Sequence, residues 1–180
     1  MNHTVRTCGT CSLCCKAMGI EELKKPAGVW CEHARPGRPG GACSIHETRY
    51  PICRGFHCQW IVSPDVPEEL KPSKCKVILT GVQGAGDDQL VAYCDPADPG
   101  AWRRGAIYGF LKRQTRRPDG RPRTVIVRVG PRYWLVTHDA DLDLGEAGGR
   151  KRFRIEPGPD GRPVARLVED SSQSGRPAEA

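Results

Sequence analysis

The sequence has few apolar residues and no long run of them. Of its 180 residues, 38% are hydrophobic and 6% are aromatic. No stretch approaches the roughly 20 apolar residues that a membrane-spanning helix needs, so the sequence indicates no membrane partner. The opening residues, MNHTVRTCGT, also lack the apolar core of a secretory signal peptide. We therefore expect a cytoplasmic protein.

Turn-forming residues and cysteines are plentiful instead. The chain holds 21 glycines, 16 prolines and 10 cysteines. A lean chain rich in turns builds a modest core and often needs a metal or disulfides to stabilise it. Disulfides are rare in the reducing cytoplasm, so clustered thiols there indicate metal ligands. A disulfide-rich secreted domain is the alternative, and the missing export signal counts against it.

Eight of the ten cysteines precede residue 60. Two neighbouring stretches, 25–28 and 35–41, are rich in Gly and Pro and disfavour long regular elements. Loops with so little core can be organised by a bound metal. We expect residues 1–62 to form a Cys-rich metal-binding or iron–sulfur-binding region, with one short helix near 19–24 and otherwise loops.

The second region, residues 63–170, is expected to be small and of mixed helix and strand. Apolar runs with β-branched residues at 76–80 and 90–93 flank a Gly- and Asp-rich segment, as in a β-hairpin. Two later pairs of runs predict further hairpins: 124–129 with 132–137, and 152–155 with 164–168.

One main helix is expected after residue 99. Trp102, Ala106 and Phe110 recur at helical spacing as one apolar stripe, and Pro118 marks the end of the pattern. The tail 171–180 has the composition of a disordered segment. The predicted class is α+β: an irregular, metal-stapled Cys-rich N-terminal half packed with a small antiparallel sheet and one main helix.

The first three cysteines have the spacing C-x2-C-x2-C at Cys8, Cys11 and Cys14. Soft thiolates bind zinc, copper(I) or iron–sulfur clusters, and this spacing with a distant fourth cysteine is typical of cubane iron–sulfur ligation. Cys15 follows Cys14 directly, and adjacent side chains of an extended chain point to opposite sides. Two ions, one polynuclear cluster, or one ligand beside one supporting thiol would each explain this pair.

Eight thiols are the number that two four-ligand sites require. His33, His46 and His57 lie among them, and each could replace a thiolate on zinc. Ordinary polar roles are the simpler interpretation of these histidines, because the thiols already suffice. Cys75 and Cys94 follow singly in predicted strands, where we expect buried free thiols.

The cysteine pattern continues in a recognisable order. CGTCSLCC at 8–15 is followed by WCEH at 30–33, CSI at 43–45 and CRGF at 53–56. This order resembles the CxxCxxCC cysteine-cluster family, whose members are described as zinc- or iron-chelating domain proteins. The resemblance implies that eight residues hold metal: Cys8, Cys11, Cys14, Cys15, Cys31, Cys43, Cys53 and Cys58.

The resemblance covers about residues 8–60 and leaves the rest of the chain without a function. One departure lies before CRGF, where the family usually has Arg-Pro. Here Arg49 is followed by Tyr50, and Pro51 comes one place later. Family members are often labelled iron–sulfur oxidoreductases, a label that names a cofactor more than a reaction.

Residues beside the cysteines fit a buried anionic centre. Four thiolates carry net negative charge, which is costly to bury without compensation. Arg49 and Arg54 could supply that compensation, while Trp30, Phe56 and Trp60 could shield the centre from water or simply form a small core.

Charge is unevenly distributed in a chain of net charge +7, and residues 99–132 are strongly basic. Asp139, Asp141 and Asp143 alternate but lack the rest of a calcium loop, so we expect a solvated acidic turn. The sequence thus predicts a metal-binding protein that carries an iron–sulfur cluster, in a redox or accessory role with an unknown protein partner. The alternative is a structural zinc module that docks nucleic acid or an acidic protein through residues 99–132, and a metal carrier is a third hypothesis.

Overall fold

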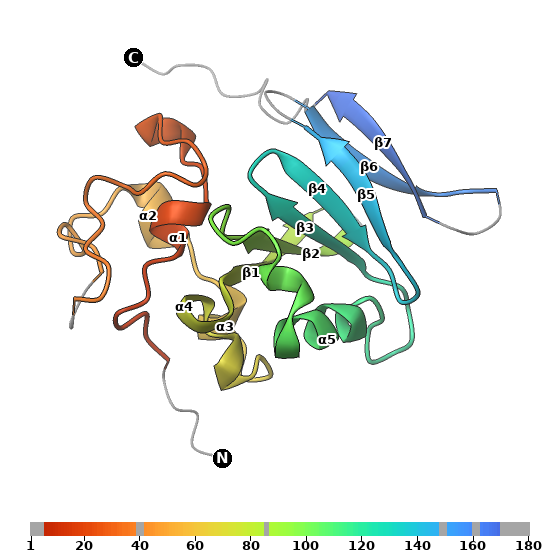
Figure 1. Ribbon diagram of the computed structural model, residues 1–180, viewed down its shortest axis with the longest axis horizontal. Helices are drawn as coiled ribbons and strands as arrows, with labels where there is room; N and C mark the ends of the chain where they lie inside the picture. The colour runs from red at the N-terminus through yellow and green to blue at the C-terminus, as the bar shows by residue number, and fades with distance from the viewer. Residues whose placement is uncertain (1–5, 39–41, 85–86, 148–150, 160–162, 170–180) are drawn as a thin grey trace.

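A five-stranded sheet lies at the centre of the computed structural model, with short helices on one side of it and a separate two-stranded sheet on the other (Figure 1). This architecture confirms the predicted α+β class. The predicted disordered tail, 171–180, lies outside the described residues. Those residues are 6–38, 42–84, 87–147, 151–159 and 163–169.

The central sheet has the strand order β1-β2-β3-β4-β5. Its strands are β1 (Val77–Gly84), β2 (Asp87–Cys94), β3 (Thr124–Val129), β4 (Arg132–Val136) and β5 (Asp141–Glu146). Neighbours pair antiparallel except β2 and β3, which are parallel. The predicted antiparallel sheet is therefore wrong in this respect, and the sheet is mixed.

The parallel pair has a simple cause in the connection between its strands. Parallel neighbours need a crossover of a dozen residues or more, usually a helix. Residues 95–123 supply it, with the 3₁₀ turn η3 (Ala101–Arg103) and the helix α5 (Gly105–Gln114). The first two predicted hairpins are confirmed as β1–β2 and β3–β4. The crossover that contains α5 connects the two hairpins, so that β2 of the first pairs with β3 of the second.

The predicted main helix exists, but it is shorter than expected, and a different set of its residues faces the core. Arg104 is extended (φ −116°, ψ 146°) and separates η3 from α5. This break resets the helical phase, so Ala106 is exposed and the buried positions are Ile107, Phe110 and Leu111. These side chains pack in the same core cluster as the strands of the sheet.

Six one-turn helices precede β1 among the described residues, and the sequence predicted only one of them. They are α1 (Cys14–Ala17), η1 (Glu21–Leu23), α2 (Pro51–Gly55), α3 (Gln59–Val62), η2 (Glu68–Leu70) and α4 (Pro72–Cys75). The helix expected near 19–24 is only the 3₁₀ turn η1. Such elements are too short for apolar periodicity, although Pro at the start of α2 and α4 is a typical helix-start signal.

The C-terminal part of the chain forms two strands that were predicted and one that was not. The third predicted hairpin is confirmed as β6 (Lys151–Pro157) and β7 (Pro163–Glu169). The expected acidic turn is wrong, because Asp141 and Asp143 belong to β5. The alternation Asp-Leu-Asp-Leu in 141–144 was itself a strand signal.

One apolar cluster joins the N-terminal region to the sheet. Leu13, Cys58 and Trp60 are buried in it together with sheet residues such as Val77 and with Trp102. The helices α3 and α4 both contact β1. This apolar cluster and the helix contacts hold the Cys-rich region against β1, which is an edge strand of the sheet. No helix among the described residues has the length and apolar character that crossing a bilayer requires.

Candidate metal centre

One cavity of about 830 Å³ collects the cysteines of the N-terminal region. Its wall includes apolar side chains such as Met18, Ile20, Phe56 and Trp60. All eight cysteines predicted as metal ligands line it: Cys8, Cys11, Cys14, Cys15, Cys31, Cys43, Cys53 and Cys58. Segments separated by up to fifty residues thus present their thiols to one space.

Each of these cysteines is a free thiol. Cys58 is buried and Cys8 is exposed, while the other six are half-buried. The thiols therefore extend from the apolar core to the surface. A metal could reach them from solvent, and the deepest ligand would already lie in the protein interior.

Short turns position the first four cysteines. The N–H of Cys11 donates to the carbonyl of Cys8 at 2.8 Å, which closes the turn of the first C-x2-C pair. The N–H of Cys15 donates to the carbonyl of Ser12 at 2.9 Å as the chain enters α1. Cys14 and Cys15 are the first two residues of that helix.

Backbone pairing brings the distant cysteines to this turn. The N–H of Cys31 donates to the carbonyl of Cys15 at 2.9 Å. Ala34 links the next two cysteines. Its N–H donates to the Cys31 carbonyl at 2.9 Å, and the same residue forms a β-bridge with Cys43. Cys53 lies within α2, and Cys58 immediately precedes α3.

The acidity of the thiols reflects this crowding. Burial raises the pKa of Cys8, Cys53 and Cys58. Cys14 and Cys15 share a hydrogen bond that raises the pKa of Cys14 and lowers that of Cys15. The Cys15 sulfur is thus the acceptor in this pair, and of the two it ionises first.

The donor chemistry fits a metal that prefers sulfur, although the thiols are not yet gathered around one point. Within the part of the chain that the structure describes, no three His, Cys, Asp or Glu side chains are arranged so that they could hold a metal ion as they stand. Eight free thiols on one cavity wall are nevertheless the ligand type that zinc and iron–sulfur clusters take. Binding would require the thiols to lose protons and draw together, as metal sites coupled to folding do.

Lys25 is a charged residue near the thiols whose importance the sequence did not reveal. Only 8% of it is exposed. Its ammonium donates to the carbonyls of Met18 (2.5 Å), Val29 (2.9 Å), Pro26 (3.1 Å) and Lys16 (3.3 Å). Burial lowers the pKa of Lys25, while neighbouring cysteine thiolates act in the opposite direction. Lys25 therefore closes the 16–29 loop and places a positive charge beside the thiols.

The residues proposed to compensate and shield the centre divide into two groups. Arg49, Phe56 and Trp60 line the cavity, as expected. Arg54 is exposed, and Trp30 is 43% exposed with its ring over the Lys16 ammonium at 5.7 Å. Neither Arg54 nor Trp30 is among the residues that line the cavity.

The remaining candidate ligands lie in varied places. His33 and His46 line the cavity, whereas His57 is exposed and is not part of its wall. Cys75 ends α4 instead of lying in a strand, and its thiol donates to the carbonyls of Leu70 and Val77, both at 3.3 Å. Cys94 ends β2 and is buried, as predicted.

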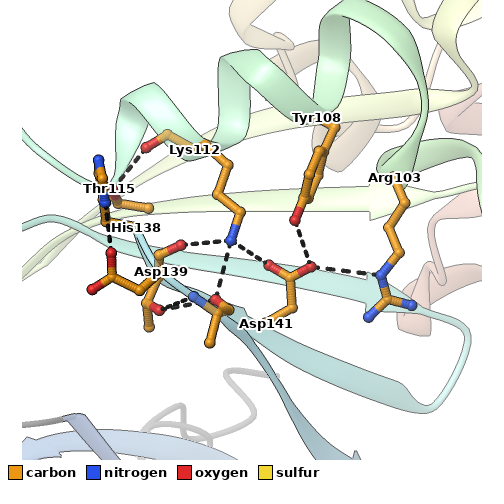
Figure 2. A network of polar contacts seen from close by, with 9 residues as sticks. Arg103, Tyr108, Lys112, Thr115, His138, Asp139 and Asp141 are labelled. Atoms are coloured by element: carbon orange, nitrogen blue, oxygen red, sulfur yellow. Dashed lines mark hydrogen bonds and ion pairs between the residues drawn. The ribbon is translucent and has the colours of Figure 1, made fainter.

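Several basic side chains of the segment 99–132 are paired with aspartates, most of which lie outside the segment. Figure 2 shows Asp141 at the centre of one such network. Its carboxylate accepts a hydrogen bond from the Tyr108 hydroxyl at 3.0 Å and forms ion pairs with Lys112 at 2.9 Å and Arg103 at 3.6 Å. Three further ion pairs involve arginines of this segment: Arg104 with Asp98, Arg121 with Asp119, and Arg132 with Asp143.

Comparisons with family models, with curated proteins and with solved structures gave no match to this chain. The resemblance to the CxxCxxCC cysteine-cluster family therefore stays a prediction from residues 8–60. The cavity and its eight thiols are the features from which a function can be inferred.

Proposed function

We propose that this protein binds a metal in the cytoplasm, and that the metal is an iron–sulfur cluster held by cysteines of the cavity. The role we infer is redox chemistry or assistance to an enzyme, with a protein partner. The observation that carries the proposal is the convergence of eight free thiols on one cavity wall. The C-x2-C-x2-C spacing of Cys8, Cys11 and Cys14 favours an iron–sulfur cluster over zinc.

The chain's own residues would tune such a centre. A bound cluster would supply one-electron transfer. Lys25 and Arg49 place positive charge beside the thiols, which lowers the cost of burying thiolate. Phe56 and Trp60 limit the access of water to the cavity, and water access is one determinant of a cluster's potential.

The test is the composition of the full chain purified without oxygen. We expect iron and acid-labile sulfide in the protein, together with the visible sulfur-to-iron charge-transfer absorption of a cluster. The variant Cys94→Ala provides a control, because it removes a thiol that lies outside the cavity. This variant should keep the full iron and sulfide content.

The outcomes separate the candidate cofactors. Zinc without iron or sulfide would overturn the iron–sulfur assignment and favour a structural zinc site. A protein that contains no metal, and that takes up neither zinc nor iron with sulfide after reduction, would overturn metal binding altogether.

The alternative role, docking of nucleic acid or an acidic protein through residues 99–132, has less support. Surface arginines bind phosphates when their charge is available to the partner. Here Arg103, Lys112 and Arg132 already pair with aspartates of β5. Four arginines of this segment line a second cavity of about 830 Å³ together with two aspartates, Asp65 and Asp119. The basic composition is thus partly neutralised by its surroundings.

A further inference from the structure

The second cavity, of about 830 Å³, lies between α3, α5 and the central sheet. Gln59 of α3 and Gln114 of α5 both line it. Among the described residues, it shares no lining residue with the cavity that holds the thiols. Its volume is typical of sites that enclose one small molecule. The chemistry of its lining therefore indicates what kind of molecule it would bind.

The floor of this cavity is apolar. Four side chains form it, and all four are buried members of the core cluster: Val66, Leu79, Leu90 and Phe110. They come from the loop after α3, from β1, from β2 and from α5. Apolar surface of this kind gains free energy when the apolar part of a ligand covers it. A ligand that fills the cavity therefore needs an apolar part.

Positive charge exceeds negative charge around this floor. Four arginines line the cavity: Arg113, Arg116, Arg117 and Arg123. Only two aspartates line it as well, so the charged residues of the lining carry a net charge of +2. One of them, Asp119, already pairs at 2.6 Å with Arg121, which does not line the cavity. The ligand should therefore be an anion.

The loop 115–123 folds back on itself and brings its arginines together. Arg116 forms a β-bridge with Pro122, and the N–H of Arg123 donates to the carbonyl of Thr115 at 2.9 Å. The guanidinium of Arg123 also donates to the side-chain oxygen of Gln114 at 2.8 Å. These bonds fix the two ends of the loop at the cavity, so part of the conformational entropy is lost before a ligand binds.

Arg113 and Arg116 have the charge that is most available to a ligand. Both side chains are exposed, and within the part of the chain that the structure describes no carboxylate forms an ion pair with either of them. A guanidinium can donate two parallel hydrogen bonds to a phosphate group. A phosphate monoester carries about −1.5 to −2 charges at pH 7, which matches the net charge of the lining.

We propose that this cavity binds a small organic phosphate, with the phosphate group on the arginines and the apolar part on the floor. The site is independent of the proposed metal centre. A nucleic-acid strand fits the observations less well, because it needs basic charge along an extended groove. Outside the cavity, Arg103, Lys112 and Arg132 are paired with aspartates of β5.

The experiment is calorimetric titration of the full chain with naphthyl phosphate, a probe that has a phosphate group and an apolar ring system. We expect one-to-one binding. Inorganic phosphate and naphthol each offer only one of the two parts, so each should bind more weakly by about tenfold or more.

Variants of the lining locate the binding. Arg113→Gln and Arg116→Gln should each weaken the binding of naphthyl phosphate by about tenfold, because each removes a charged donor. Both positions are exposed, so the variants should fold. Arg104→Gln is the matched control, since it removes the same charge from an exposed side chain outside the cavity. Asp65→Asn should strengthen binding, because it removes negative charge from the lining.

The outcomes decide the ligand class. Absence of naphthyl phosphate binding, or equal affinities in Arg113→Gln, Arg116→Gln and Arg104→Gln, would overturn the proposal. An oligouridylate that binds where naphthyl phosphate does not would assign the arginines to nucleic acid and would also overturn it. Iron and sulfide content of the same samples reports separately on the metal centre, so failure of one site is distinguishable from failure of the other.

Discussion

At the scale of single residues, Lys25 is the charged side chain most tightly enclosed by the Cys-rich region. Four backbone carbonyls around its ammonium would otherwise repel one another. A cation that satisfies several carbonyls stabilises a loop that lacks a regular backbone ladder, and here it supplements the N–H of Gly28, which donates to the Lys16 carbonyl at 2.9 Å. No pattern in the sequence indicates this role, since Lys25 stands in a Gly- and Pro-rich segment beside a second lysine.

Lys25→Met should destabilise the protein by about 2–4 kcal/mol, because it removes a charged donor from several part-buried carbonyls at once. The measurement is the midpoint of urea unfolding, followed by tryptophan fluorescence. Lys24→Met is the matched control, since it removes the same charge from an exposed neighbouring side chain. Equal midpoints for the two variants would contradict the role of Lys25.

At the scale of elements, Asp141 links α5 to the edge strand β5. Tyr108 and Lys112 belong to the helix, Arg103 belongs to the turn before it, and all three contact the Asp141 carboxylate (Figure 2). The side chain of Asp141 is 13% exposed, so water screens these contacts only in part. The network fixes the crossover helix against the far edge of the sheet.

Asp141→Asn should destabilise the protein by about 2 kcal/mol, because Lys112 and Arg103 would then face each other without an anion between them. Thermal unfolding followed by circular dichroism provides the measurement. Asp143→Asn is the control on the same strand, where the carboxylate pairs with exposed Arg132. A shift in the control as large as that in Asp141→Asn would show that charge on β5 matters in general and that the network does not.

Among the helices and strands, some could be predicted from sequence patterns and others could not. The paired apolar runs predicted β1–β2, β3–β4 and β6–β7, because alternation and turn residues are local signals. The parallel contact of β2 with β3 depends on where α5 places the chain, which no local pattern encodes. Helices of one turn, such as α1 and α3, offer too few residues for a periodic signal.

The candidate site was predictable to a similar degree. Cysteine spacing identified all eight thiols that line the cavity. Their relative positions were not predictable, because they depend on the helical turn that holds Cys14 and Cys15 and on the backbone contact of Cys31 with Cys15.

At the scale of the whole molecule, the sheet and the Cys-rich region have different sources of order. Strand ladders and buried residues such as Val125 and Val127 hold the sheet together. Between residues 6 and 38 the structure consists of turns, isolated bridges and one-turn helices. Stability should therefore be unequal along the chain, as is common for regions with few backbone ladders.

Removal of the metal from the full chain should affect the two regions unequally. Hydrogen exchange should become faster in residues 6–62 and stay slow in β1, β2 and β3, because a thiolate-bound metal orders the loops that it crosslinks. Exchange measured by mass spectrometry, before and after a chelator under reducing conditions, provides the test. Uniform acceleration across the sheet would contradict this separation, and an unchanged profile would show that no metal orders the loops.

The adjacency of Cys14 and Cys15 has a further consequence for metal uptake. A metal that binds either thiol would fix the first turn of α1 and with it the backbone of the other cysteine. The remaining thiol would then bind with a smaller loss of conformational entropy, so later ligands join more readily than the first. Partly ligated molecules should accordingly be scarce at limiting metal.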